Sequence, residues 1–212
     1  FSSASASDWV LLEGFLKWLQ SQQDPLGDLW HSLIMDRLWD VMPADMRGGR
    51  SRQDLRDLCL VSSVGVAAGH NEDGAPDRQY REKRDTLNRC GYALWREAED
   101  DVLQACWDKA RDCDSTCKAV VAIKVLEQFR RCNKHARVEK IASEALRHIR
   151  PGENGYDKIL SALVWAEKTE GATDKGHPLW DGVFLLLEEE GAKTDGKSFW
   201  QSFTRCGDFV YA

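Results

Sequence analysis

"PLGDLWHSLIMDRLWDVMP", residues 25–43, decides the fold class of this chain. Its apolar side chains recur at the i, i+3, i+4, i+7 spacing that places them on one face of an α-helix. Pro43 cannot continue a helix and therefore closes the segment. The stretch predicts an amphipathic helix that buries one face against a core. Its apolar positions are Leu26, Leu29, Trp30, Leu33, Ile34, Leu38, Val41 and Met42.

Helical periodicity also dominates the rest of the N-terminal half. Ser7 and Asp8 can cap a helix over "DWVLLEGFLKWLQ", and "SRQD" at 51–54 is a capping signal for the next one. "LCLVSSVGVA", residues 58–67, is ambiguous between strand and helix, and we assign it to a helix. Strand-like alternation is otherwise scarce, so we expect an all-α protein.

Helical periodicity continues through the rest of the chain. A long helix is predicted from residue 76 through 98, either continuing to 110 or breaking at the acidic cluster 99–101. Asp114 or Ser115 then caps "CKAVVAIKVLEQFRRC". Glycine-rich turns separate the remaining segments. Further helices are predicted over 136–149, 156–168, 178–191 and 197–210.

We therefore expect a disulfide-stapled multi-helix bundle of about seven or eight helices. The 212 residues are enough for one large core, so residues 1–212 are predicted as a single domain, with a division into 1–150 and 151–212 as the alternative. The nine tryptophans are spread along the whole chain and are interpreted first as core side chains.

The cysteines indicate an oxidising compartment. Seven are present without any Cys-x-x-Cys pair, which argues against zinc knuckles and thioredoxin-like sites. Cys113 and Cys117 lie one helical turn apart, so each is expected to reach a different helix. Two alternatives stay open: a metal site that uses this pair, and reduced, buried thiols in a cytosolic protein. The disulfide candidates are Cys59, Cys90, Cys106, Cys113, Cys117, Cys132 and Cys206.

Several function classes find little support. The net charge of −6 argues against a nucleic-acid partner, and no apolar run is long enough to span a membrane. The five histidines are isolated, and no hydrolase, metalloprotease or phosphate-loop motif is present, so we predict no catalytic residues, metal or cofactor. The start "FSSASASDW" is no signal peptide, which makes an exported protein of this sequence a trimmed ectodomain.

Positive charge is concentrated in one segment. Residues 118–150 carry nine Lys or Arg against three Glu, a net charge of +6, which leaves −12 on the remainder. Such a segment can bind an acidic glycan or an acidic face of a host protein, and it can equally balance acidic segments of its own chain. The candidate binding patch is Lys124, Arg130, Arg131, Lys134, Arg137 and Lys140.

The order of these segments resembles a known family. "LLEGFLKWL", "DLWHSLIMDRLWDVM", "DLCLV", "RCGYALW" and "CKAVVAIKVLEQFRRC" follow one another as in malaria-parasite variant surface antigens, in particular the schizont-infected cell agglutination (SICA) antigens and related exported families. The resemblance covers roughly residues 9–132. It implies a secreted or cell-surface domain in host–parasite interaction, with cell adhesion or antigenic variation as its role, and no catalysis.

Two other classes remain as alternatives. One is a secreted effector that binds a host protein through a helical face. The other is an intracellular cysteine-rich helical protein or enzyme. The thiol state separates the intracellular class from the other two, because disulfides persist in oxidising compartments and are rare in the cytosol.

Overall fold

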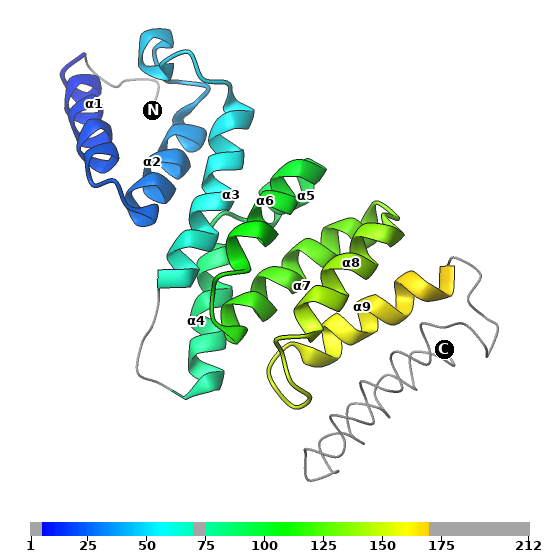
Figure 1. The fold of residues 1–212 in the computed structure, drawn as a ribbon. Coiled ribbons are helices and arrows are strands. Elements are labelled where there is room, and N and C mark those ends of the chain that lie inside the picture. The colour runs from blue at the N-terminus through cyan, green and yellow to red at the C-terminus, as the bar shows by residue number, and fades with distance from the viewer. Residues whose placement is uncertain (1–5, 70–74, 170–212) are drawn as a thin grey trace. The chain divides into compact units, whose positions relative to one another are not determined.

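The computed structural model describes residues 6–69 and 75–169, and this part of the chain contains helices and no strand (Figure 1). The predicted all-α class is therefore confirmed. No helix in these residues is long and apolar enough to cross a membrane. The helices are α1 Ala6–Ser21, α2 Pro25–Leu38, the short 3-10 helix η1 Ala44–Arg47, α3 Arg52–Gly69, α4 Pro76–Asn88, α5 Tyr92–Glu97, α6 Asp100–Ala110, α7 Ser115–Arg131, α8 His135–Leu146 and α9 Tyr156–Thr169.

The chain forms two compact units. Unit 1 comprises Phe1–Asp73 and Arg81–Asp112, and unit 2 comprises Gly74–Tyr80 and Cys113–Ala212. The main boundary thus lies at 112/113, and α7, α8 and α9 belong to the same unit. The single domain over 1–212 and the alternative division at 150 stay predictions.

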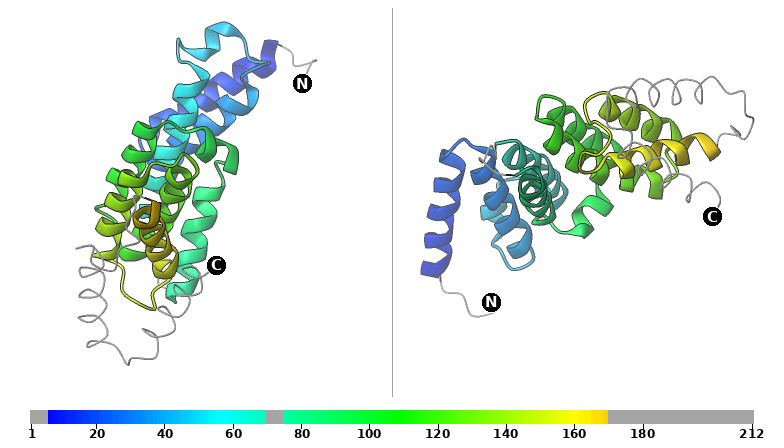
Figure 2. Two further views of the ribbon diagram at one scale, coloured as in Figure 1. Left: turned by 90° about the vertical axis from the view of Figure 1, so that its right-hand side faces the viewer. Right: turned by 90° about the horizontal axis from the view of Figure 1, so that it is seen from below.

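In unit 1 the helices pack in sequence order. Helix α1 runs beside α2, α2 packs along α3, and α3 also contacts α5 and α6 (Figures 1 and 2). The predicted apolar stripe of residues 25–43 supplies Ile34, Leu38 and Met42 to one core cluster, whereas its members Leu26, Trp30 and Val41 are exposed, so the predicted burial is wrong for these three. That cluster contains Leu16, Leu19, Met35, Met42 and Leu55, with Trp9, Leu12, Ile34, Leu38, Trp39 and Met46 packed against it.

Side-chain caps fix where two of these helices begin. The Asp24 carboxylate accepts a hydrogen bond of 2.6 Å from the Gly27 amide, and Pro25 occupies the first turn of α2. Ahead of α3, the Ser51 hydroxyl accepts from the Asp54 amide at 3.0 Å, and the Asp54 carboxylate accepts from the Ser51 amide at 2.8 Å. This reciprocal pair is a capping box, so the signal in "SRQD" is confirmed.

The prediction of one continuous long helix from residue 76 is wrong. The segment 76–110 is three helices, α4, α5 and α6. Gly91 has φ +81°, a conformation that glycine adopts without steric cost, and it ends the run after α4. Ala98 is extended and separates α5 from α6. The described residues therefore hold nine α-helices, and Cys90 and Cys106 do not share one helix.

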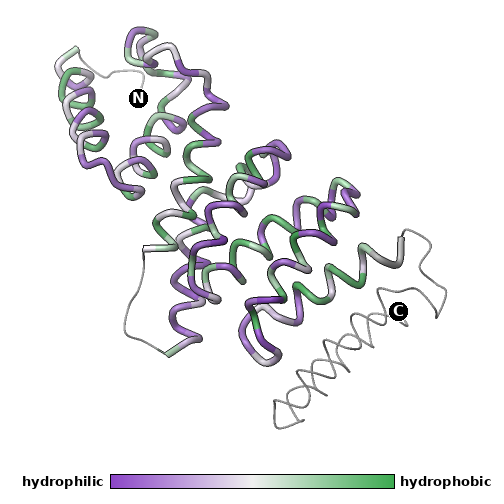
Figure 3. Tube along the Cα trace, in the orientation of Figure 1, coloured by the Kyte–Doolittle hydropathy of each residue, from purple (hydrophilic) through white to green (hydrophobic). Residues whose placement is uncertain are grey.

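Unit 2 packs α7, α8 and α9 against one another. Asp114 caps α7, because its carboxylate accepts from the Cys117 amide at 2.8 Å, as predicted. Gly155 has φ +94°, and a side chain there would approach Ile123 of α7 to 2.9 Å. Figure 3 shows the contrast between the largely hydrophilic α4 and the more apolar helices, and α7 alone buries ten of its residues.

The tryptophans do not share one environment. Trp95 and Trp107 are fully buried, as predicted for core side chains, whereas Trp18 and Trp30 are 54% and 44% exposed. The prediction is therefore wrong for these two. Partly buried tryptophans are Trp9, Trp39 and Trp165, while Trp180 and Trp200 lie outside the described residues.

Candidate functional site

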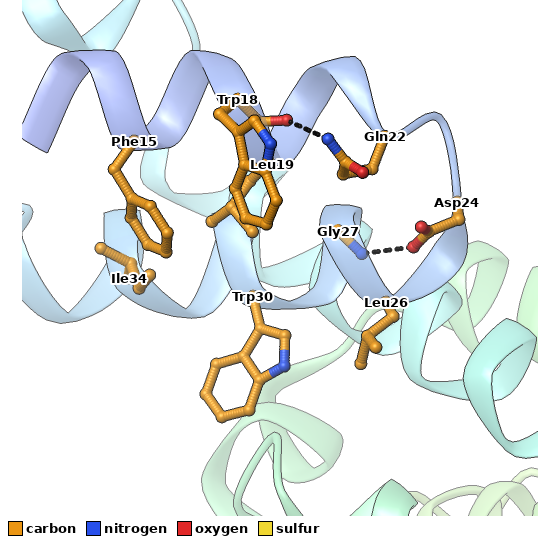
Figure 4. Close-up of a pocket in the computed structure, with 9 residues that line it drawn as sticks. All are labelled: Phe15, Trp18, Leu19, Gln22, Asp24, Leu26, Gly27, Trp30 and Ile34. Carbon is orange, nitrogen blue, oxygen red and sulfur yellow. Dashed lines mark hydrogen bonds between the residues drawn. The ribbon is translucent and has the colours of Figure 1, made fainter.

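One candidate site is an apolar groove formed by the α1–α2 hairpin. Its cavity volume is about 480 Å³, within the range of ligand-binding pockets. Figure 4 shows Phe15 and Trp18 extending from α1 toward α2, with Ile34 facing Phe15, while Leu26 and Trp30 extend from the side of α2 away from α1. We call this site the α1–α2 groove. Its lining residues are Phe15, Trp18, Leu19, Gln22, Asp24, Leu26, Gly27, Trp30 and Ile34.

Helix α1 is apolar on two faces, and this places side chains in the groove. Leu16 and Leu19 are buried in the core cluster. A second stripe, Leu11, Phe15 and Trp18, follows the same i, i+4, i+7 spacing but remains exposed. The Phe15 and Trp18 rings stack with centroids 5.7 Å apart. Exposed apolar patches of this kind mark interaction surfaces in soluble proteins.

A close backbone approach sets the geometry of the hairpin. A Cβ added to Gly27 would lie 2.6 Å from the Leu19 carbonyl oxygen, so only glycine lets α2 begin this close to the end of α1. The turn is held by further bonds: the Ser21 hydroxyl and the Gln22 amide both donate to the Trp18 carbonyl, at 2.7 and 3.1 Å. The turn between α1 and α2 therefore fixes the spacing of the two helices that form the groove.

The groove carries little charge. Asp24 is the one ionisable residue among its lining residues, and one of its oxygens already caps α2. Nearby on α1, Lys17 and Glu13 pair with each other at 2.6 Å. The groove therefore suits an apolar ligand with at most one cation beside Asp24. Within residues 6–69 and 75–169, no group of three or more His, Cys, Asp or Glu could hold a metal ion.

The predicted basic patch lies on two neighbouring helices of unit 2. Lys124, Arg130 and Arg131 belong to α7, Lys134 is the N-cap of α8, and Arg137 and Lys140 belong to α8. The Arg130 guanidinium lies 5.2 Å from the Trp165 ring centroid, and the His135 ring stacks on the same indole at 4.4 Å. Arg137 lies 5.6 Å from the Phe129 ring.

Two of the six cations, Arg130 and Arg137, thus lie against aromatic rings, which orients their side chains. The role of the patch as a binding site stays a prediction.

Among the cysteines that the structure describes, Cys59 and Cys90 lie close together. The Sγ atoms of Cys59 and Cys90 lie 3.0 Å apart and are buried in unit 1. Among the described cysteines, no two sulfurs are at disulfide-bonding distance. Cys106 is fully buried, and burial, followed by the nearby Cys90, raises its pKa to about 12.

The remaining cysteines lie at the two ends of α7 or beyond the described residues. Cys113 is half-buried ahead of α7, Cys117 is buried in its first turn, and Cys132 is exposed at its C-cap. Cys206 lies outside the described residues. The pairing of the seven cysteines stays a prediction.

The α1–α2 groove was missed at the sequence level because all tryptophans were assigned to the core. A signal was present in the second stripe of α1, since Leu11, Phe15 and Trp18 duplicate the spacing of the buried stripe on another face. A helix with two apolar faces needs two partners, and α2 is only one.

Comparisons with protein-family models, with curated proteins and with solved structures find no match to this chain. The function must therefore be inferred from the residues themselves.

Proposed function

We propose that this chain is a non-catalytic binding domain, displayed or secreted outside the cell, whose α1–α2 groove binds an amphipathic α-helix of a partner protein. The observation that carries the proposal is the exposure of Phe15, Trp18 and Trp30 around one cavity. Large aromatic side chains are enriched in binding hot spots because they bury much apolar area on contact.

A helix is the partner element that fits the walls of the groove. Phe15 and Trp18 of α1 form one wall, and Leu26, Trp30 and Ile34 of α2, four residues apart, form another. Walls of this spacing accept the side chains of a third helix packed between them. A helix laid into such a groove binds through apolar anchors at i, i+3, i+4 and i+7.

Charge gives the partner helix a direction. The groove is apolar along its middle, with Asp24 at the end nearest the turn. A Lys or Arg at one end of the partner helix would complement this carboxylate, while a carboxylate there would be repelled. The proposed ligand is therefore an amphipathic helix with one terminal cation.

The extracellular placement is part of the same proposal. It is supported by seven cysteines in a small helical chain and by the resemblance to malaria-parasite variant surface antigens. On this proposal the domain is a variant antigen or host-interaction module stapled by disulfides, and the partner helix belongs to a host protein. A secreted effector using the same groove is the alternative, as is an intracellular protein with reduced thiols.

The basic patch supports a second candidate function, binding of an acidic glycan or an acidic protein face. The observation in its favour is the presence of Arg130, Arg131, Lys134 and Arg137 around one helix–helix turn with aromatic rings beside them. Charge reversal at Arg130, Arg131 and Lys134 should abolish binding to heparin in low salt. Unchanged retention on a heparin column would remove this candidate.

The groove is tested by titrating the full chain into a fluorescently labelled helical peptide of about 18 residues, long enough to be helical in a complex. The probe has Leu at i, i+3, i+4 and i+7 and one terminal Lys; a peptide of the same composition in scrambled order is the control. We expect saturable binding of the first peptide. Equal binding of both peptides, or no binding, would contradict the proposal.

Matched variants locate the binding. Trp30→Ser should weaken binding of the helical peptide about tenfold or more, because hot-spot truncations cost at least about 1.4 kcal/mol. Val41 is 48% exposed but lies outside the groove, so Val41→Ser should bind like the unmodified chain. Equal weakening by both substitutions would place the binding surface elsewhere.

A further inference from the structure

We infer that Cys59 and Cys90 form one specific disulfide in the oxidised protein, which joins the middle of α3 to the turn after α4. The inference is specific to this pair and excludes Cys106 as the partner of either cysteine. It rests on the proposed extracellular placement only for the source of the oxidant, since an oxidising compartment supplies the disulfide that exchange requires.

The geometry of unit 1 brings these two sulfurs together. Their Sγ atoms are 3.0 Å apart, and a disulfide bond is about 2.05 Å long, so about 1 Å must be closed. We expect side-chain rotation about the two Cα–Cβ bonds to close this distance. The two residues are far apart in sequence and on different elements, so no local spacing accounts for the approach.

The surroundings keep both sulfurs in place. Cys59 is fully buried and Cys90 nearly so, and the Cys59 thiol donates to the Cys90 sulfur. The Cys90 thiol in turn lies 3.4 Å from the Cys59 carbonyl oxygen. This hydrogen bond to Cys90, together with burial, raises the pKa of the Cys59 thiol well above its ordinary value. Because both sulfurs are buried, a small-molecule oxidant reaches them only while the core is open, so we expect the bond to form before the unit is fully folded.

The turn at Gly91 explains why this approach occurs. Because Gly91 has φ +81°, the chain reverses immediately after Cys90 instead of continuing the helix. The reversal places Leu94 and Trp95 in the core, and the Trp95 indole donates to the Leu87 carbonyl at 3.0 Å across it. Cys90 is thereby held at the inner side of the turn, facing α3.

The oxidation balances with a small-molecule disulfide as oxidant. One cysteine, as its thiolate, attacks the oxidant, which forms a mixed disulfide and releases one thiol of the oxidant. The second cysteine then loses its proton and attacks the mixed disulfide, which forms the Cys59–Cys90 bond and releases the second thiol. Two electrons pass from the cysteine pair to the oxidant, so the protein loses two hydrogens and the oxidant becomes two thiols.

The test begins with the full, unmodified chain, unfolded in reductant and refolded with glutathione disulfide. Free thiols are alkylated, the protein is digested without reduction, and cross-linked peptides are identified by mass. We expect a peptide pair joined through Cys59 and Cys90 that disappears on reduction. Alkylation of both cysteines without reduction, or a bond from either one to Cys106, would overturn the inference.

Variants extend the test to stability. Reductant should lower the urea midpoint of the unmodified chain and of Cys132→Ser, whose residue is exposed, by more than it lowers that of Cys59→Ala, which lacks the bond. An equal effect of reductant on Cys59→Ala would contradict the assignment. If Cys59→Ala does not fold, the peptide map of the unmodified chain still decides.

Protein isolated from its own cells separates this inference from the proposed function. The Cys59–Cys90 bond in refolded protein, together with reduced thiols in the cellular protein, would support the pairing and contradict the extracellular placement.

Discussion

Trp95 and Trp30 belong to the same compact unit but lie in opposite environments. Trp95 is fully buried after the Gly91 turn, and its indole nitrogen donates to the Leu87 carbonyl. Trp30, on the α1–α2 hairpin, is 44% exposed beside a cavity. The residue type is the same, so the difference comes from the elements around each ring. Tryptophans in the α3–α6 region stabilise the fold, and those on the hairpin are placed for contact with something else.

The largest difference between the two regions is expected on truncation of the buried ring. Trp95→Ala should lower the free energy of unfolding by about 3–5 kcal/mol, because it leaves a large cavity in the core. Trp30→Ala should cost less than about 1 kcal/mol, since half of its ring is already in water. Urea unfolding of both variants measures the two values, and equal losses would abolish the distinction.

An ion-pair cluster fixes α2 to α3 and therefore the hairpin to the rest of unit 1. Asp36 of α2 accepts from Arg52 at 2.8 Å and from Arg56 at 3.0 Å. Burial raises the pKa of Asp36, but the hydrogen bonds from the two guanidinium groups outweigh it, so the pKa lies below its ordinary value. The ionised carboxylate is thus the form that stabilises the fold.

Asp36→Asn should lower the free energy of unfolding by about 1.5–3 kcal/mol at neutral pH, the range for hydrogen bonds to charged groups. A depressed native pKa contributes stability that is fully present above the unfolded pKa of about 3.9 and is lost as pH falls through the native value. The difference in free energy of unfolding between the unmodified chain and Asp36→Asn should therefore vanish below about pH 4. Urea midpoints of both proteins from about pH 7 to pH 3 measure this difference. A difference that does not change with pH would refute the stabilising role of the ionised Asp36 carboxylate.

The hairpin turn provides a third test of the comparison. In Gly27→Ala the new Cβ would meet the Leu19 carbonyl, so α1 and α2 must separate, at a cost of about 1–3 kcal/mol typical of overpacking. Peptide binding to the groove should be lost with it. Gly14→Ala on α1 is the control: no atom lies within 4 Å of its new Cβ, so a gain of about 0.5–1 kcal/mol is expected. Destabilisation by both would indicate that α1 tolerates no added volume.

The smallest effect on stability should come from the groove itself. The double variant Trp18→Ser with Trp30→Ser should change the free energy of unfolding by about 1 kcal/mol or less, because both rings are exposed. Its solubility should rise, since the apolar patch is removed. A loss of several kcal/mol would mean that the rings are covered in the native protein.

Much of the fold could be predicted from the sequence, because helix periodicity and caps act locally. The helix over Pro25–Leu38, the capping box at Ser51 and the cap at Asp114 required only spacing and residue type. Which apolar residues of that helix are buried did not follow from spacing, because Leu26 and Trp30 are exposed. The Gly91 break was missed because a single glycine inside a helical pattern is often tolerated. Its positive φ could not be predicted from residue type alone.

The candidate sites depend on contacts between distant segments, and these could not be predicted in the same way. The Cys59–Cys90 approach joins residues on separate elements, and seven cysteines allow many pairings. The exposed rings of Trp18 and Trp30 were assigned to the core because tryptophan is usually buried. The second stripe of α1 was the one local sign that a further partner is needed.

The proposed groove is tested most directly by the indole N–H resonances of the full chain during titration with the helical peptide. We expect the Trp18 and Trp30 signals to shift in a saturable manner, while those of the buried Trp95 and Trp107 stay in place. Shifts confined to other tryptophans, or no shift at Trp18 and Trp30 at saturating peptide, would show that the hairpin is not the binding surface.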